Sequence, residues 1–337
     1  MPMSKPRARV MLLGASGTIG RATLDALLAR GHEVVCFLRA DPHSSRRGLP
    51  EAAILRFGEV TDPQALARDG FCGESFDALV SCLASRTGQP AEAWAIDHQA
   101  HLAALQIAQA QGVRQMVLLS AICVQRPLLA FQHAKLAFEA ALIASGLTYS
   151  IVRPTAFFKS LSGQVARLRQ GKPFLIFGDG LLTACKPISD ADLAEYLADC
   201  LDNPLCANQI LPIGGPGPAI TPRAQGEALF RLLGQAPKFR SVPIGLMDAI
   251  IAALGLLGRL SPKWRAKAEL AKIGRYYATQ SMLVLNPETG RYDPEATPST
   301  GTDTLFDFYA QLLRDEAAVD LGAHAVFAAT AKVQSAH

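Results

Sequence analysis

The sequence predicts an α/β fold in which helices cover both faces of a doubly wound parallel sheet. Six short apolar segments alternate with helix-like segments through the first half of the chain, and this alternation is typical of parallel sheets. A glycine-rich turn joins the first apolar segment to the first helix. Half of the 337 residues are hydrophobic, which suits strands buried on both faces. Together these observations predict a Rossmann-type domain followed by a smaller, mainly helical C-terminal region.

The expected strands and helices follow one another in a regular order. Strands are predicted at residues 10–13, 33–38, 54–57, 78–82, 115–120 and 149–152. Helices are predicted at residues 18–30, 93–111 and 131–145, and a glycine follows each of them (Gly31, Gly112 and Gly146). Glycine adopts the left-handed conformation that commonly ends a helix. Right-handed connections between parallel strands then place these helices on the faces of the sheet.

The chain is predicted to divide near residue 155. Residues 1–155 are expected to form the dinucleotide-binding Rossmann domain, and residues 156–337 the substrate-binding region, with a strand at 209–213 that returns to the sheet. Helices predicted at 161–170 and 190–202 flank a glycine- and proline-rich stretch at 171–180. Ser189 and Asp192 have the spacing of a capping box at the start of the second helix. The Ala-rich tail from residue 321 is expected to fray.

Composition and charge exclude several classes of function. A net charge of +4 is too small to predict nucleic-acid binding. The seven cysteines form no C-x-x-C pair, so reduced thiols in a cytoplasm are expected, without an iron–sulfur cluster or structural zinc. His98 and His101 lack a carboxylate or cysteine at ligand spacing, so we expect surface or helix-packing roles and no metal site. No signal peptide is expected, because the apolar run at 10–13 is too short.

Gly14, Gly17 and Gly20 give the first helix the opening G-x-x-G-x-x-G. Glycines at a strand–helix turn let the backbone approach a pyrophosphate, and the free N–H groups of the helix start attract the anion. The spacing resembles that of the short-chain dehydrogenase/reductase superfamily, especially its extended and atypical members. The whole loop is predicted to bind the cofactor: Gly14, Ser16, Gly17, Thr18, Ile19 and Gly20.

Arg39 ends the second predicted strand, nineteen positions after Gly20. Proteins that bind NAD usually have an acidic residue here to hold the ribose 2′-hydroxyl. This chain has no acid until Asp41, and Arg46 and Arg47 follow. A guanidinium pairs bidentately with a phosphate, so NADPH is the predicted cofactor. A solvated surface arginine is the alternative.

The ends of later strands supply further predicted cofactor contacts. Glu59 and Val60 follow the third strand, where related reductases place residues against adenine. Asp62 fits that role or the N-cap of the next helix equally well. The residues predicted to flank the nicotinamide ribose follow strands four, five and six: Cys82, Leu83, Ala84, Ser120 and Pro154.

Lys135 is the predicted catalytic residue. Its helix reads Phe131-x-x-x-Lys135, where the superfamily has Y-x-x-x-K, with tyrosine as acid/base and lysine on the ribose. Phenylalanine cannot donate a proton, so ordinary alcohol–ketone chemistry is not expected. The pattern resembles the isoflavone-reductase-like and NmrA-like branch, which implies reduction of a C=C or C–O bond with Lys135 and water moving the proton. An exposed helix lysine is the alternative.

An apolar segment at residues 244–260 is followed by a basic segment that contains Trp264. The apolar segment is shorter than the ~20 residues of a membrane span, but the combination fits a peripheral membrane contact through residues 244–275. A lid over a large apolar substrate fits as well, and core packing is the commonest role of such a stripe. Phe157 and Phe158 are likewise assigned either to a substrate pocket or to the core.

The C-terminal third carries a more specific resemblance. Residues 273–284 (IGRYYATQSMLV) and 291–305 (RYDPEATPSTGTDTL) resemble the NADPH-dependent divinyl (proto)chlorophyllide 8-vinyl reductases of plants and photosynthetic bacteria. The resemblance implies hydride transfer from NADPH to the 8-vinyl group of 3,8-divinyl chlorophyllide a, or of protochlorophyllide, to give the 8-ethyl pigment. It implies a tetrapyrrole partner near Phe131, with Tyr276 and Tyr277 as proton donors or pocket walls, and a cytoplasmic location beside a photosynthetic membrane.

Three other functions agree with the same Rossmann pattern. An NmrA-like regulator would sense NADP(H) without catalysis, an accessory subunit would sit at a membrane, and a related reductase would act on another apolar alkene. A sensor needs no large apolar pocket, so Lys135 and the apolar and basic C-terminal segments favour an enzyme.

Overall fold

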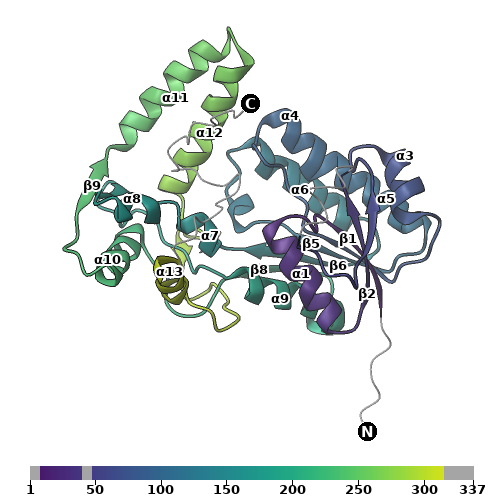
Figure 1. The fold of residues 1–337 in the computed structure, drawn as a ribbon. Coiled ribbons are helices and arrows are strands. Elements are labelled where there is room, and N and C mark those ends of the chain that lie inside the picture. The colour runs from purple at the N-terminus through teal and green to yellow at the C-terminus, as the bar shows by residue number, and fades with distance from the viewer. Residues whose placement is uncertain (1–7, 40–47, 315–337) are drawn as a thin grey trace, which may run out of the picture.

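The computed structural model describes residues 8–39 and 48–314. Seven strands form one sheet in the order β3-β2-β1-β4-β5-β6-β8, and every neighbouring pair is parallel. The strands are β1 (Arg9–Leu13), β2 (Glu33–Leu38), β3 (Ile54–Phe57), β4 (Ala78–Ser81), β5 (Gln115–Leu119), β6 (Thr148–Pro154) and β8 (Gln209–Ile213). Figure 1 shows this sheet between its helices. The arrangement confirms the predicted doubly wound sheet and its returning strand.

The sheet has a core on each face because alternate residues of a strand point to opposite sides. Val10 and Leu12 pack in one core, whereas Met11 and Leu13 pack in the other. The first core is closed by α1 (Thr18–Ala29) and α9 (Asp190–Asp202). The second is closed by α5 (His101–Ala110) and α6 (Ala130–Ile143). Burial on both faces explains why the strands are almost continuously apolar.

The helix predicted at 93–111 begins earlier and is not uniform. It starts as α4 (Pro90–Ala93), continues through the π-helical segment η2 (Trp94–Ala100) and ends as α5. Such π-helical turns often occur at functional sites. Four shorter helical segments connect other elements: α3 (Pro63–Ala65), η1 (Leu66–Phe71), η3 (Ile122–Gln125) and η4 (Pro204–Cys206).

The C-terminal region has a core of its own, built around Phe158, Leu229 and Tyr309. It comprises α7 (Phe158–Leu161), α8 (Val165–Arg169), α10 (Pro222–Leu232) and α13 (Leu305–Arg314). The helix predicted at 161–170 is thus divided between α7 and α8. Within the stretch predicted to be irregular, β7 (Phe174–Phe177) pairs in parallel with β9 (Phe239–Val242). A short antiparallel pair, β10 (Val284–Leu285) and β11 (Tyr292–Asp293), precedes α13.

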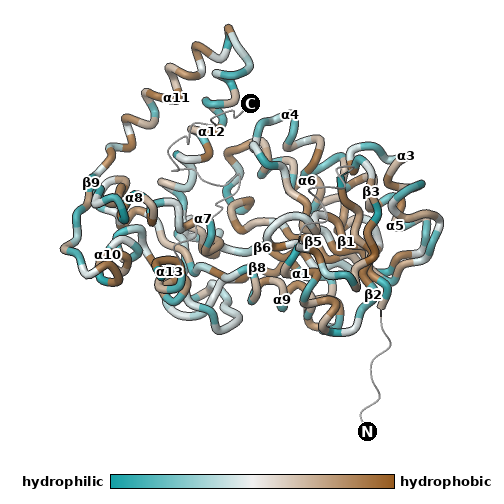
Figure 2. Tube along the Cα trace, viewed as in Figure 1, coloured by the Kyte–Doolittle hydropathy of each residue, from teal (hydrophilic) through white to brown (hydrophobic). Residues whose placement is uncertain are grey.

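The apolar and basic segments form a helical hairpin, α11 (Ile244–Gly258) and α12 (Pro262–Thr279). The two helices pack against each other, and Figure 1 shows them extending away from the rest of the molecule. Gly258 is the one buried residue of α11. Figure 2 shows hydrophobic residues along this helix, outside the cores of the sheet. Core packing, the commonest role of an apolar stripe, is therefore wrong for α11.

Residues 190–213 belong structurally with the Rossmann layers, although they follow the predicted boundary at 155. Helix α9 packs against α1, and β8 extends the sheet beside β6. The chain therefore leaves the sheet after β6, forms part of the C-terminal region and then returns. Among the helices of the described ranges, none is both long and apolar enough to cross a bilayer.

Two predicted helix caps are present. Asp62 accepts a hydrogen bond from the backbone N–H of Gln64 at 2.9 Å and starts α3, which decides between its two predicted roles. Ser189 accepts from the backbone N–H of Asp192 at 3.0 Å and starts α9. The carboxylate of Asp192 does not complete a capping box. It accepts instead from the backbone N–H groups of Thr302 and Asp303, at 3.1 and 3.0 Å.

Candidate cofactor and substrate site

The three glycines after β1 have different structural requirements. Gly14 has φ +83°, and a Cβ atom there would lie 2.7 Å from the carbonyl carbon of Cys82. A Cβ on Gly20 would lie 2.1 Å from the carbonyl oxygen of Gly14. A Cβ on Gly17 would meet only that same oxygen at 3.4 Å, an ordinary contact. Packing therefore requires Gly14 and Gly20, whereas the bare backbone at Gly17 leaves room for a ligand.

The start of α1 is suited to an anion. Its N-cap, Gly17, has no side chain to satisfy the first N–H groups, and the first turn contains no acidic residue. Ser16 and Thr18 are exposed, whereas the Ile19 side chain packs in the core, so Ile19 offers a ligand only its backbone. Unpaired N–H groups and the helix dipole together favour a phosphate at this position.

This helix start lies at the point where the sheet changes direction. From β1 the strand order proceeds through β2 to β3, and from β4 it proceeds through β5 and β6 to β8. Ligands of doubly wound sheets bind at this switch point. Cys82 and Leu83, which follow β4, are half-buried against Gly14, and Ala84 is exposed. Burial raises the pKa of the Cys82 thiol to about 11, so the thiol is neutral at physiological pH.

Arg39 and Glu59 follow the neighbouring strands β2 and β3, and both are exposed. Glu59 accepts a hydrogen bond from the Thr61 hydroxyl at 3.0 Å. Val60 is buried in the sheet core, so its side chain does not reach a ligand. Residues 46 and 47, which supply two further predicted arginines, lie outside the described residues.

Lys135 lies on α6 and forms an ion pair with Asp97 of η2, with 3.1 Å between Nζ and Oδ1. The two side chains are only 10% and 0% exposed. Asp97 Oδ1 also accepts from the backbone N–H of Ser85 at 3.3 Å. Asp97 Oδ2 is buried and has no hydrogen-bond partner within the described part of the chain. The alternative of an exposed surface lysine is therefore wrong, and the acid that positions Lys135 was not predicted.

Phe131 and Tyr276 share one apolar cluster with Ile122 and Ile273. This brings together α6 and α12, which lie far apart in the sequence. The Tyr276 hydroxyl donates to the carbonyl oxygens of Cys123 at 2.8 Å and Arg126 at 3.1 Å. Burial raises the pKa of Tyr276. Its hydroxyl is thus engaged in holding α12, which favours the wall over the proton donor among its two predicted roles.

Tyr277 is 41% exposed as a residue, but its hydroxyl lies 4.0 Å from the buried Cys123 thiol. Desolvation raises the pKa of Tyr277 well above its usual range. The two phenylalanines predicted for the substrate pocket pack in different cores. Phe157 is half-buried against the sheet core, whereas Phe158 is buried in the C-terminal core beside Phe308. For Phe158 the core alternative is favoured.

Ser120 and Pro154 contribute mainly to internal structure. The Ser120 hydroxyl donates to the buried carboxylate of Glu139, which also pairs with Arg153. This network ties β5 and β6 to α6 and fixes the helix that carries Lys135. Pro154 is buried and pairs in register with Ile213 of β8. Neither side chain presents a free polar group to a ligand.

Lys159 is a second residue that the sequence did not single out. It lies on α7, and its Nζ is 3.5 Å from the Thr18 hydroxyl of the glycine loop. Burial raises the pKa of the neighbouring Asp190 carboxyl, and the charge of Lys159 opposes that shift. A cation from the C-terminal region therefore stands beside the anion-binding helix start.

The histidines have the expected packing roles. His101 is buried, and its Nε2 and Nδ1 lie 2.8 Å from the Ser81 hydroxyl and the Ile96 carbonyl oxygen. Burial lowers its pKa to about 4. His98 contacts Trp94 edge to face, with the ring centroids 5.3 Å apart. In the two described ranges, no group of three or more His, Cys, Asp or Glu side chains is placed to hold a metal ion.

Comparisons with known proteins agree with this geometry. A family model described as NAD(P)H-binding matches residues 14–204. The divinyl chlorophyllide a 8-vinyl-reductase of Zea mays is 49% identical over 331 residues, covering 94% of this chain and 82% of its own. The enzyme of that name from Arabidopsis thaliana is 47% identical, covering 91% of this chain and 77% of its own. The chain belongs to the divinyl chlorophyllide a 8-vinyl-reductase family.

A solved structure supports the fold over most of the chain. The NADPH-dependent quinone oxidoreductase QOR2 of Escherichia coli, complexed with NADPH, aligns with a TM-score of 0.67 at 18% identity. The alignment covers 90% of this chain and all of that one. At this identity the likeness concerns the fold alone.

The segment that suggested the 8-vinyl-reductase family has a structural role. Lys186 is buried and donates to the carbonyl oxygen of Thr297 at 2.9 Å, and the backbone N–H of Gly214 donates to Pro298 at 2.8 Å. Gly301 has φ +79°, and a Cβ there would lie 2.0 Å from the Asp192 carboxylate carbon. Residues of the 291–305 segment therefore hold this part of the chain against the end of β8 and the start of α9.

Proposed function

We propose that the protein transfers a hydride from NADPH to the 8-vinyl group of 3,8-divinyl chlorophyllide a, or of protochlorophyllide, and produces the 8-ethyl pigment of chlorophyll or bacteriochlorophyll biosynthesis. The observation that carries this proposal is the 49% identity to a reductase of that name across 94% of the chain. The alignment also covers 82% of the relative's own length.

The residues at the switch point fit a dinucleotide. The bare backbone at Gly17, the uncapped start of α1 and the Lys135–Asp97 pair are each suited to a phosphate or a ribose. The loop from Gly14 to Gly20 would hold the pyrophosphate, Arg39 the 2′-phosphate, and Lys135 the nicotinamide ribose. The backbone at Cys82, Leu83 and Ala84 would flank that ribose.

NADPH rather than NADH is supported by Arg39, which stands where an acid would bind the 2′-hydroxyl. We expect Arg39→Asp to weaken binding of NADPH far more than binding of NADH, measured by titrating cofactor fluorescence. Equal losses for the two cofactors would contradict a contact with the 2′-phosphate.

The bound cofactor supplies the hydride, and this chain must supply the proton. Addition of a hydride to the terminal vinyl carbon leaves an electron pair that the tetrapyrrole ring delocalises, and protonation of the inner vinyl carbon completes the ethyl group. Phe131 cannot donate that proton, and the Tyr276 hydroxyl is committed to two carbonyl oxygens. We assign the proton to Lys135, which Asp97 holds in place, acting with water. Delocalisation into the ring lowers the demand for an oxyanion hole.

The substrate side suits a flat, apolar pigment that carries carboxylates. Phe131 and Tyr276 bring aromatic surface from α6 and α12 into one cluster on the helix that carries Lys135. Tyr277 adjoins this cluster through Cys123. Phe157, which follows β6, packs against the core of α1 and α9 and would contact the pigment only at its exposed edge. We also propose that residues 244–275 make a peripheral contact with a photosynthetic membrane, where such a pigment would be concentrated.

The direct test is turnover. Purified protein with NADPH should convert 3,8-divinyl chlorophyllide a to the monovinyl pigment, and the Soret band should shift to the blue as the vinyl group leaves conjugation. Parallel reactions with divinyl protochlorophyllide define the preferred pigment. Binding of NADPH without conversion of either pigment would overturn the proposal and favour an NADP(H) sensor.

A further inference from the structure

Helix α11 exposes apolar side chains along almost its whole length. Leu246, Ile250, Leu256 and Leu257 are 52%, 41%, 61% and 41% exposed, and Leu260 in the following turn is 84% exposed. Burial of one such side chain is worth about 1.5–3 kcal/mol, so a row of them in water is unfavourable. Contiguous exposed apolar surface of this kind marks a contact with a partner or a membrane.

The same hairpin concentrates positive charge. Residues 244–279 contain six Lys or Arg and two Asp or Glu, a net +4 that equals the net charge of the entire chain. Both acids are already paired, Asp248 with Arg275 and Glu269 with Lys272. The remaining cations make no ion pair within the described residues: Arg259, Lys263, Arg265 and Lys267.

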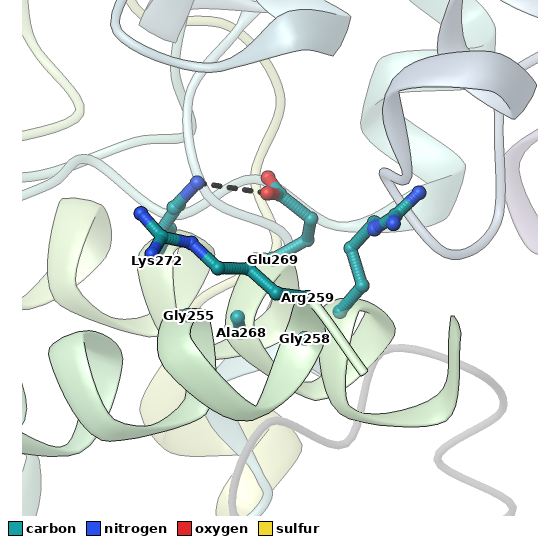
Figure 3. Close-up of a pocket in the computed structure, with 7 residues that line it drawn as sticks. Gly255, Gly258, Arg259, Ala268, Glu269 and Lys272 are labelled. Carbon is teal, nitrogen blue, oxygen red and sulfur yellow. Dashed lines mark hydrogen bonds and ion pairs between the residues drawn. The ribbon is translucent and has the colours of Figure 1, made fainter. Parts of the chain in front are cut away.

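A hollow of about 230 Å³ lies between the two helices of the hairpin. Figure 3 shows Arg259 and Lys272 as sticks around the bare backbone of Gly255 and Gly258. Arg265 also lines it, together with Ala268 and Glu269. A Cβ on Gly258 would lie 3.1 Å from the Arg265 Cα, so glycine there lets the helices approach closely. Three cations and one paired acid therefore surround a small opening next to the apolar face.

We propose that the α11–α12 hairpin docks on the surface of an anionic bilayer and that this hollow receives the phosphate of an anionic phospholipid. Helix α11 has 15 residues, so it is about 22 Å long and would lie in the plane of the interface with its apolar side among the acyl chains. Trp264, with the Lys267 ammonium 4.5 Å from its ring centroid, has the apolar body and charged neighbour that suit this boundary.

Charge argues for a bilayer over a second copy of the chain. Two hairpins packed through their apolar faces would bring together two segments that each carry +4, with no unpaired acid on the hairpin to compensate. On an anionic surface, by contrast, each unpaired cation should increase partitioning of the protein to the membrane about five-fold. The proposal does not depend on the reaction that the protein catalyses, although a docked hairpin would bring the substrate side close to membrane-held pigment.

Vesicle flotation of the full-length protein tests this inference without turnover. Vesicles of phosphatidylcholine alone are compared with vesicles that also contain phosphatidylglycerol, at low and high salt. We expect co-flotation with the anionic vesicles and its loss at high salt. The Leu256→Ser/Leu257→Ser variant should lose flotation while it keeps the wild-type melting temperature, because both side chains are exposed.

A matched pair of variants tests the hollow. Lys263→Gln/Lys267→Gln removes two cations outside it and should weaken partitioning roughly 25-fold, about five-fold per charge. Arg259→Gln/Arg265→Gln removes the same charge from the hollow and should weaken partitioning several-fold further. Equal losses would overturn the phosphate site. Failure of the wild type to float, or dimerisation that Leu256→Ser/Leu257→Ser abolishes, would overturn membrane docking.

Discussion

Removal of the Lys135 charge should lower the stability of the fold, in addition to any effect on catalysis. Lys135→Ala leaves Asp97 as a fully buried carboxylate without its cation, and breaking a buried ion pair in this way costs about 3–5 kcal/mol. For a chain of this size each kcal/mol lowers the melting temperature by about 2 °C. We therefore expect a loss of roughly 6–10 °C in thermal unfolding.

A second variant separates stability from function. Asp97→Asn/Lys135→Met removes both charges, fills similar volume and keeps an oxygen that can accept from the Ser85 N–H. Its melting temperature should return close to that of the wild type, because a buried pair replaced by neutral groups costs little. Its affinity for NADPH should stay roughly 10- to 100-fold below wild type, since hydrogen bonds to a charged group contribute about 1.5–3 kcal/mol.

Differential scanning fluorimetry and titration of NADPH fluorescence measure the two quantities independently. A wild-type melting temperature for Lys135→Ala would refute the buried pair. Wild-type affinity for NADPH in the double variant would show that Lys135 only supports the fold and does not hold the ribose.

Three further predictions follow from the site. Gly17→Ala should change the melting temperature by less than about 3 °C, because its methyl group meets only ordinary contacts in the protein, but it should strongly weaken the binding of NADPH. Gly20→Ala should instead destabilise the fold. Equal behaviour of the two variants would contradict this reasoning. Lys159→Gln should lower the affinity for NADPH roughly tenfold without changing the affinity for adenosine 2′-monophosphate, which has no pyrophosphate. Equal losses of affinity for the two ligands in isothermal titration calorimetry would exclude a pyrophosphate contact. The pKa of His101 is lowered to about 4 in the fold, so the unfolded chain binds the proton first as the pH falls. The contribution of His101 to stability is complete above pH 6.5, at about 3 kcal/mol, and is lost as the pH decreases from 6.5 towards 4. Denaturant unfolding of His101→Gln should therefore show a shallower loss over that range, and an unchanged slope would argue against a buried neutral imidazole.

The order of strands and helices in the first half was predictable, because each strand is apolar on both faces and each glycine-ended helix separates two strands. The pair β7 and β9 was missed because β7 has only four residues and lies between glycines, which resemble a loop in sequence. The sequence left the exposure of α11 open between a membrane contact, a lid and core packing. Periodicity identifies the residues that share a helical face, but it does not reveal whether another element covers that face.

The candidate site was predicted best where backbone geometry determines the residue. The roles of Gly14 and Gly20 follow from close contacts that any side chain would disrupt. Asp97 and Lys159 were missed because an acid or a lysine on a helix has the same sequence signature whether it is solvated or paired. Their importance depends on contacts with Lys135 and Thr18, which lie far away in the sequence.

The late return of β8 has a consequence for how this protein is made and recombined. Strand β6 ends at Pro154 but cannot gain its second neighbour until residues 209–213 have been synthesised, so the sheet edge stays open while part of the C-terminal region emerges from the ribosome. The long intervening loop adds an entropic cost to that closure. For the same reason, a chimera with a relative cannot exchange the C-terminal region at one junction. It needs crossovers on both sides of the segment from α9 to β8.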